Sequence, residues 1–313
     1  MGVSEGPDAG FAGRFPRMSG SGSLVAVREA VLDAVLGRTE NEVLNPRPAE
    51  ESFTTARDLA ASFARAINVV KAEAIDACGR HVDYARLEAG PGFAAYRRLT
   101  PALRDLTLAH ILTRRERLAF WLNLYNALVI DGVLTHKVRR SITEGRLGMF
   151  TFFRRAAYRI GGARFSCDDI EHGVLRANRG HPFLPGPQFA ASDPRLAWII
   201  DPPDARVHFA LNCASRSCPP IGAYDPDHVD AQLTLATRNF LDQETDLNRQ
   251  RGELRLPRLF KWFARDFGGR PGVIAFLLHY LPDDDRRAWL EARGPRARFA
   301  YHRYDWSLNV LAG

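Results

Sequence analysis

The sequence predicts an α+β fold that is mainly helical, with one small β-sheet. Apolar residues recur at helical spacing along much of the chain, as Leu59, Phe63, Ile67 and Val70 do within residues 52–79. Segments with the alternation or turn signals of strands are few and scattered. A doubly wound parallel sheet needs many strands in regular alternation with helices, so that class is not expected.

Composition favours a single globular domain behind a short leader. The chain has 313 residues, of which 46% are apolar, enough to fill a core. Residues 1–23 are rich in Gly and Ser and lack the apolar run of a secretory signal, which predicts a disordered leader before a domain over 24–313. No uninterrupted run of 18 apolar residues occurs, so we expect no membrane span and a cytoplasmic protein.

The net charge of +7 does not by itself indicate a nucleic-acid partner. Only three of the 43 basic residues are lysines, a bias typical of GC-rich codons, and acidic residues are interspersed with the arginines. No groove-reading motif accompanies the charge, so we expect no specific nucleic acid. The glycine loops of nucleotide sites, H-E-x-x-H and G-x-S-x-G are absent, so we expect no cofactor and no metal. A small molecule or a peptide remains as the ligand, and the oligomeric state stays open.

Five helices are predicted in the first half of the chain, over residues 24–37, 52–79, 81–88, 100–109 and 114–135. The last of these is apolar on every side and is therefore expected to be buried, with a helical part of the domain ahead of it. Residues 158–169 predict a hairpin that turns at Gly161–Gly162, followed by a short helix capped by Ser166 or Asp168.

The second half predicts strands at 206–213, at 253–256 and in the alternating segment near residue 300. Between them, helices are predicted over residues 225–241, 257–267, 271–281 and 284–292.

Two asparagines, Asn123 and Asn126, lie three residues apart in the apolar helix and therefore share a face. A buried amide without a partner costs about 1–3 kcal/mol, so both side chains are expected to form hydrogen bonds. They either tie the helix to another segment or orient a catalytic group or a ligand. Asn123 is the candidate catalytic residue and Asn126 the candidate binding residue.

A second candidate group is Glu171–His172, followed by Arg176. His172 and Arg176 are four residues apart and can meet on one helix face. His172 is either a structural histidine or a catalytic base, and Glu171 is a candidate binding residue.

The third candidate is the segment HFALNCASRSCPP, residues 208–220. Cys213 is placed where a strand gives way to a loop, a common position for reactive side chains. A thiol nucleophile needs a base, and His208 or His172 could supply it. The alternative is an inert core thiol. Three neighbours are candidate binding residues: Asn212, Ser215 and Cys218.

The spacing of Cys213 and Cys218 leaves their redox state open. Four intervening residues in a tight loop can bring the two Cα atoms within the roughly 4.4–6.8 Å of a disulfide. In a cytoplasmic protein we expect the two thiols to be reduced, with Cys213 the more reactive.

Several segments together resemble the DUF547 family. They are RERLAFWLNLYNALVIDGVL, YRIGGARFSCDDIEHGVLR, DPPDARVHFALNCASRSCPP, LPRLFKWFARDF and YDWSLN, and they occur in the family's order across residues 50–310. The family's function is uncharacterised. Plant relatives often lose the histidine of the IEH motif or the second loop cysteine. This chain keeps both, as His172 and Cys218, and is more similar to the bacterial branch.

Two functions of different class follow. The first is a hydrolase or acyl transferase with Cys213 as nucleophile, a histidine as base and an asparagine orienting it, the set used by papain-like enzymes. The second is a non-catalytic domain that binds a peptide or another protein. A redox or metal role for the two loop cysteines is a more distant third. In the enzyme hypothesis, the side chains of Asn123, His172, His208 and Cys213 converge on one pocket.

Overall fold

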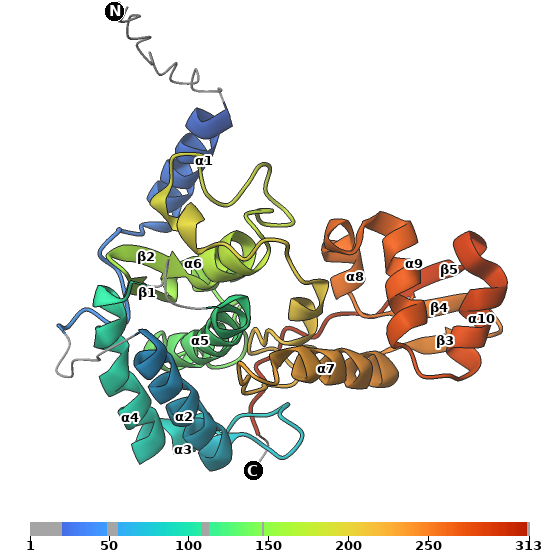
Figure 1. Ribbon diagram of the computed structural model, residues 1–313, viewed down its shortest axis with the longest axis horizontal. Coiled ribbons are helices and arrows are strands. Elements are labelled where there is room, and N and C mark those ends of the chain that lie inside the picture. Colours follow the sequence, from blue (N-terminus) through green and yellow to red (C-terminus); the bar gives the residue numbers. More distant parts are fainter. Residues whose placement is uncertain (1–20, 49–55, 108–112, 146, 312–313) are drawn as a thin grey trace, which may run out of the picture.

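The computed structural model describes residues 21–48, 56–107, 113–145 and 147–311. It is mainly helical with a two-stranded and a three-stranded sheet, which confirms the predicted α+β class. Figure 1 shows a larger lobe formed by the first six helices and a smaller lobe at the other end, with α7 (Val229–Glu244) running between them. Residues 1–20 of the predicted leader lie outside the described residues, and α1 (Ser21–Leu36) begins within its last three.

The first third of the chain is helical, as predicted, but the helices after α1 are shorter than the predicted ranges, and the helix over Pro91–Leu99 was not predicted. These helices are α2 (Ala56–Ala74), α3 (Tyr84–Ala89), α4 (Pro91–Leu99) and the 3₁₀ turn η1 (Thr100–Asp105). The predicted face of α2 is buried throughout, from Leu59 to Val70. The helix predicted over 100–109 is instead the 3₁₀ turn η1. The end of that prediction, from residue 108, lies outside the described residues.

Helix α5 (Arg114–Thr135) has the predicted bounds and forms the centre of the larger lobe. Thr113 and Glu116 form a capping box at its N-terminus, which satisfies two backbone N–H groups. In length and composition α5 is the one helix of the described residues that could cross a membrane. However, 89% of its most apolar window is buried inside the protein. Packing within the core therefore accounts for its apolar composition.

The predicted hairpin is confirmed. After α6 (Met149–Arg155), β1 (Ala157–Ile160) pairs antiparallel with β2 (Ala163–Ser166), and Gly161 and Gly162 supply the positive φ angles of the turn. The Ser166 hydroxyl then accepts the N–H of Asp169 at 3.1 Å, so Ser166 is the cap of the helix that follows. That helix, η2 (Asp169–Leu175), is π-helical.

The strand predicted over residues 206–213 is wrong. Residues Ala205–Phe209 form a 3₁₀ turn, η4, which the Asp204 side chain caps by accepting the N–H of Arg206 at 2.9 Å. The apolar run reflects burial rather than pairing: Val207 belongs to the core of the larger lobe and Phe209 to that of the smaller lobe. A short apolar run does not distinguish the two cases.

The smaller lobe packs helices against a three-stranded sheet. Strand β3 (Asp246–Asn248) pairs antiparallel with β4 (Glu253–Leu256), which pairs in parallel with β5 (Arg298–Tyr301). The helices are α8 (Leu259–Trp262), the 3₁₀ turn η5 (Ala264–Phe267), α9 (Gly269–Tyr280), α10 (Asp285–Arg293) and the 3₁₀ turn η6 (Gly294–Arg296). The helix predicted over 257–267 is thus two short pieces.

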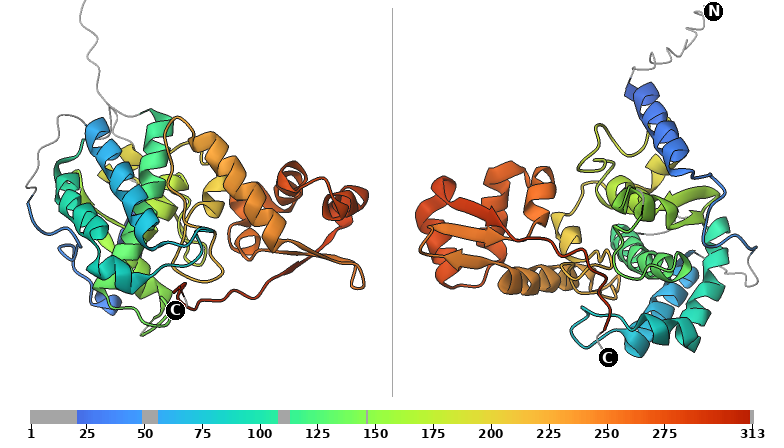
Figure 2. Two further views of the ribbon diagram at one scale, coloured as in Figure 1. Left: turned by 90° about the horizontal axis from the view of Figure 1, so that it is seen from below. Right: turned by 180° about the vertical axis from the view of Figure 1, so that it is seen from behind.

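The segment after β5 returns from the smaller lobe to the larger one, as Figure 2 shows in dark red. We call residues 302–310 the tail segment. Isolated bridges join it to three distant parts of the chain: Ser141 with Ser307, Ser215 with Leu308, and Val82 with Val310. The Asn309 side chain accepts a hydrogen bond from Tyr84 at 2.8 Å. The tail segment therefore fixes the loop that follows Leu211 against the larger lobe.

Candidate functional site

One cavity collects most of the residues that the sequence singled out. It has a volume of about 80 Å³, and we call it the inner cavity. Its lining comes from both lobes: α5, α6, η2, the loop after Gly180, η4, the loop after Leu211, α8 and the tail segment. Among the predicted site residues, the following line it: Glu171, His172, His208, Cys213 and Cys218.

The two loop cysteines form a disulfide, with Cα atoms 6.2 Å apart, so the expectation of reduced thiols is wrong for this structure. The loop geometry explains the pairing. Cys218 donates its N–H to the Ser215 carbonyl at 3.0 Å, and Cys213 directs its own N–H to the Cys218 sulfur at 2.9 Å. These contacts fold the four intervening residues into a turn that brings the two sulfur atoms together.

Hydroxyl groups surround the disulfide. The Tyr304 hydroxyl lies 3.2 Å from the Cys213 sulfur and 3.1 Å from that of Cys218, and the Ser215 hydroxyl lies 3.0 Å from Cys213. Ala214 has a φ of 63°, a left-handed conformation unusual for alanine, which concentrates local strain in this loop. The Ser215 hydroxyl contacts both sulfur atoms, but Ser215 does not line the inner cavity.

The asparagines predicted as site residues are structural clamps. Asn123 donates to the Tyr224 carbonyl at 2.7 Å and accepts the Tyr224 N–H at 2.8 Å. Asn126 donates to the Ala210 carbonyl at 3.0 Å and accepts the Asn212 N–H at 2.9 Å. Their predicted burial and backbone bonding are confirmed.

None of Asn123, Asn126 and Asn212 lines the inner cavity. The predicted convergence of His172, His208, Asn123 and Cys213 therefore holds for three of the four. Asn212 donates to the Pro219 carbonyl at 2.6 Å, so its role is to hold the cysteine loop.

Arg176 connects two parts of the site. Its guanidinium donates to Asp266 at 2.5 Å, to the Gly180 carbonyl at 2.6 Å and to His172 Nδ1 at 2.9 Å. The predicted contact of His172 with Arg176 is thereby confirmed. Burial opposes the charge on Asp266, but hydrogen bonds from His208 and Arg176 lower its pKa below the usual range. Asp266 is therefore ionised at neutral pH.

His208 is held by this carboxylate. Its Nε2 lies 2.8 Å from Asp266, and its ring stacks on Phe263 with centroids 4.1 Å apart. Because Asp266 is ionised and accepts, His208 Nε2 carries the proton and Nδ1 keeps a lone pair. No hydrogen bond within the described residues uses Nδ1. Burial lowers the pKa of His208, so the ring is neutral and Nδ1 is available as a base.

A second polar group of the inner cavity consists of Asp168, His172 and His181. One oxygen of Asp168 and one nitrogen of each ring lie within 4.8 Å of one another, and all three residues are at least nine-tenths buried. Burial raises the pKa of Asp168 to about 8 and lowers that of His181 to about 4. Glu171, beside them, accepts a hydrogen bond from Tyr125 at 2.9 Å, and burial raises its pKa.

A larger cavity of about 680 Å³, the outer cavity, adjoins the inner one. The two share the lining residues His181, Pro182, Trp262 and Phe263. Arg179 and Arg265 contribute to the outer cavity, so a ligand that extends outward meets a basic environment.

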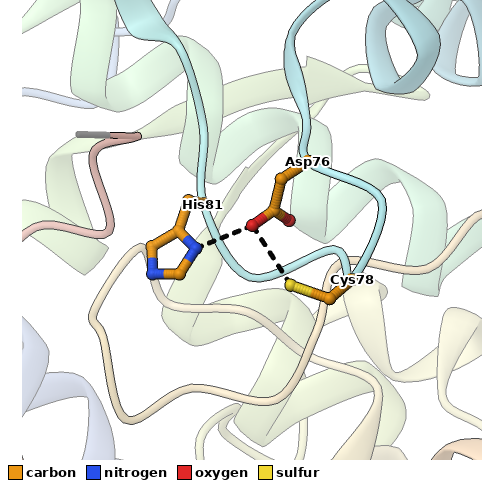
Figure 3. Close-up of side chains that lie close together, drawn as sticks. All are labelled: Asp76, Cys78 and His81. Atoms are coloured by element: carbon orange, nitrogen blue, oxygen red, sulfur yellow. Dashed lines mark hydrogen bonds and ion pairs between the residues drawn. The ribbon is translucent and has the colours of Figure 1, made fainter. Parts of the chain in front are cut away.

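The chain has another cluster of metal-ligand residue types, in the loop before α3. Figure 3 shows Asp76 between His81 and Cys78, at 2.7 Å from His81 Nδ1 and 3.1 Å from the Cys78 sulfur. Asp76 also accepts the N–H of Arg80 at 2.7 Å. Although burial opposes it, these hydrogen bonds lower the pKa of Asp76 to about 2. Each donor is satisfied by the carboxylate, so this cluster closes a turn.

Several residues that line the inner cavity, or bond to its lining as Asp266 does, were not predicted as site residues from the sequence: Asp168, His181, Trp262, Phe263, Asp266 and Tyr304. Most of them lie in segments that carried the family resemblance, so the resemblance was a usable signal. His181 lies in a proline-rich loop, where no periodicity marks it.

Comparison with known proteins identifies a family but no function. The family model DUF547, described as a protein of unknown function, matches residues 110–241. No curated protein matches the chain, and no solved structure does. The match is narrower than the resemblance over 50–310: it contains all nine predicted site residues but ends before Trp262, Asp266 and Tyr304. The chain therefore carries a DUF547 region over residues 110–241, as its sequence predicted.

Proposed function

We propose that the protein is a thiol-dependent hydrolase or acyl transferase whose nucleophile is Cys213 in its reduced form. The observation that carries the proposal is the His208–Asp266 pair, joined at 2.8 Å, because His208 lines the same cavity as Cys213. A cysteine, a histidine and a carboxylate that orients the histidine are the groups that thiol acyl transfer requires. Asp266 takes the orienting role first expected of an asparagine.

In the proposed reaction, His208 Nδ1 removes the proton from the Cys213 thiol. The thiolate attacks the acyl carbon of an ester or amide and forms a thioester, and the leaving group takes the proton from the imidazolium. Water or an acceptor nucleophile then gives a proton to His208 Nδ1 and attacks the thioester carbon; the acyl group is released, and the proton returns to the Cys213 sulfur. Asp266 stabilises the imidazolium in both steps, and no cofactor takes part.

The disulfide makes the oxidised protein a latent form. Attack by an external thiol on the Cys218 sulfur would release Cys213 and leave a mixed disulfide on Cys218, which a second thiol would reduce while the two external thiols become a disulfide. A cytoplasmic location, which we propose with the function, would supply such thiols.

The test removes the masking cysteine. We expect Cys218→Ser to leave Cys213 free without reductant, so that iodoacetamide labels it at neutral pH and a nitrophenyl ester is hydrolysed. Adding His208→Gln should slow both reactions by about 10²-fold or more, because the base is lost. Mass spectrometry assigns the label, and exposed Cys78 in the same molecule is the reference thiol. Labelling of Cys213 no faster than Cys78 would refute the proposal.

A second function, binding of a peptide or another protein, is favoured by the aromatic wall of the inner cavity. Trp262, Tyr304 and Trp306 contact one another, with centroids 4.5–5.6 Å apart. Aromatic surfaces of this kind bind extended peptides. If Cys218→Ser has no thiol reactivity but the protein retains peptides from a random library, this second function replaces the first.

A further inference from the structure

We propose that His172 and His181 form a binding site for the carboxylate of a small organic acid at one side of the inner cavity. The three buried side chains that meet there, these two histidines and Asp168, all line the cavity. No hydrogen bond within the described residues reaches either oxygen of Asp168 or the Nε2 atoms of the two rings. Buried polar groups without partners are uncommon in proteins, so this group points to a ligand.

The tautomer of each histidine follows from the partner of its Nδ1 atom. His172 Nδ1 lies 2.9 Å from the Arg176 guanidinium, and His181 Nδ1 lies 3.2 Å from the backbone N–H of Phe183. Guanidinium and backbone N–H groups can only donate, so both Nδ1 atoms accept. Each neutral ring must then carry its proton on Nε2. The site thus presents two N–H donors and no histidine lone pair.

This arrangement distinguishes an anion site from a metal site. Histidines that bind a metal through Nε2 usually donate Nδ1–H to a carboxylate or a carbonyl, which leaves the Nε2 lone pair for the ion. Here both Nδ1 atoms face donors, the reverse of that pattern. One atom each of Asp168, His172 and His181 lie within 4.8 Å of one another, as in a metal site. However, both histidines carry a hydrogen on Nε2, where a metal ion would need a lone pair.

Asp168 supports the same assignment. Its oxygen lies 3.8 Å from His172 Nε2, too far for a hydrogen bond, so the carboxyl group is open to a third partner. Burial favours its neutral form, which can donate its own proton to a bound carboxylate. A protonated carboxyl beside a carboxylate forms a short, charge-assisted hydrogen bond.

The cavity sets the size of the acid. About 80 Å³ is roughly half of an engineered protein cavity of about 150 Å³ that holds benzene. A carboxylate with a short alkyl chain fits that space, and Met149, Phe153 and Leu211 supply apolar contacts. A longer ligand would pass His181 and Pro182 into the outer cavity.

This inference rests on the cavity and not on thiol chemistry, although the acyl oxygen of the proposed substrate would use the same donors. The test is therefore a binding experiment in a Cys213→Ser variant, which cannot perform the proposed reaction. Acetate, propionate and butyrate are titrated into protein with ¹⁵N-labelled histidine, and the neutral propionamide is the comparison ligand. We expect saturable shifts of the His172 and His181 Nε2–H signals with propionate, and weaker binding of propionamide.

His181→Phe removes the donor while keeping a ring, and should weaken propionate binding by about tenfold or more. His181→Gln, which restores an N–H donor, should recover part of the affinity. His228→Phe is the matched control, because that histidine is exposed and should leave binding unchanged. Unchanged binding in folded His181→Phe would overturn the proposal. Stoichiometric binding of Zn²⁺ that His181→Phe abolishes, or no saturable shift with any of the acids, would also overturn it.

Discussion

Replacement of Asn126 by leucine tests whether the central helix holds the cysteine loop. The amide satisfies the Ala210 carbonyl and the Asn212 N–H, both within a buried segment. Leucine has a similar size but no polar atom, so both backbone groups would lose their partners. Each such group costs about 1–3 kcal/mol, which gives about 2–6 kcal/mol of lost stability.

The assay is urea unfolding followed by circular dichroism, with Asn239→Leu as the matched control. Asn239 is exposed on α7, so its replacement should change the free energy of unfolding by less than about 0.5 kcal/mol. The clamp also holds the backbone of Ala210 and Asn212, three residues and one residue before Cys213, so Asn126→Leu should loosen the disulfide loop and speed its reduction by dithiothreitol. If Asn126→Leu is no more destabilising than the control, the amide is not a clamp and the reasoning fails.

Three further predictions concern the surroundings of the site. Gly173→Ala should cost about 1–3 kcal/mol, measured by thermal unfolding, because a Cβ there would lie 2.2 Å from the Phe189 ring; an unchanged melting temperature would contradict this. The pKa of Asp168 is about 8 in the folded protein against about 3.9 in an unfolded chain, so stability falls as pH rises from 4 to 8. Asp168→Asn should therefore gain a few kcal/mol relative to the unaltered protein over that range in urea titrations, and a constant difference would refute the shift. Tyr84→Phe removes the hydrogen bond to Asn309 and should cost about 1 kcal/mol, with faster amide exchange at Leu308 and Asn309 as the specific sign.

The sequence predicts best where one physical requirement dominates. The bounds of α5 follow from a long apolar segment, and the hairpin follows from two consecutive glycines. The strand predicted over 206–213 fails because burial alone produces an apolar run, and η4 is buried by two cores at once. Local periodicity carries no information on which distant surfaces enclose a segment.

In the candidate site too, features set by a single segment were predicted, whereas features set by distant parts of the chain were not. His208 and Cys213 were identified from their own segment, but the partner of His208 is Asp266, which is 58 residues away on the smaller lobe. The asparagines were correctly predicted to be buried and bonded, yet they serve the backbone rather than the cavity. The disulfide depends on a turn around Ser215 that the spacing permits but does not impose.

The return of the tail segment has a consequence for the order in which the protein matures. Residues 302–310 leave the ribosome after all of the helices and strands of both lobes have been synthesised. Until then, Ser215 lacks its bridge to Leu308, and the two sulfurs lack the Tyr304 hydroxyl. A nascent chain can therefore fold much of its larger lobe while the cysteine loop is still unsupported. The inner cavity is completed only when the tail segment has been synthesised and crosses back between the lobes.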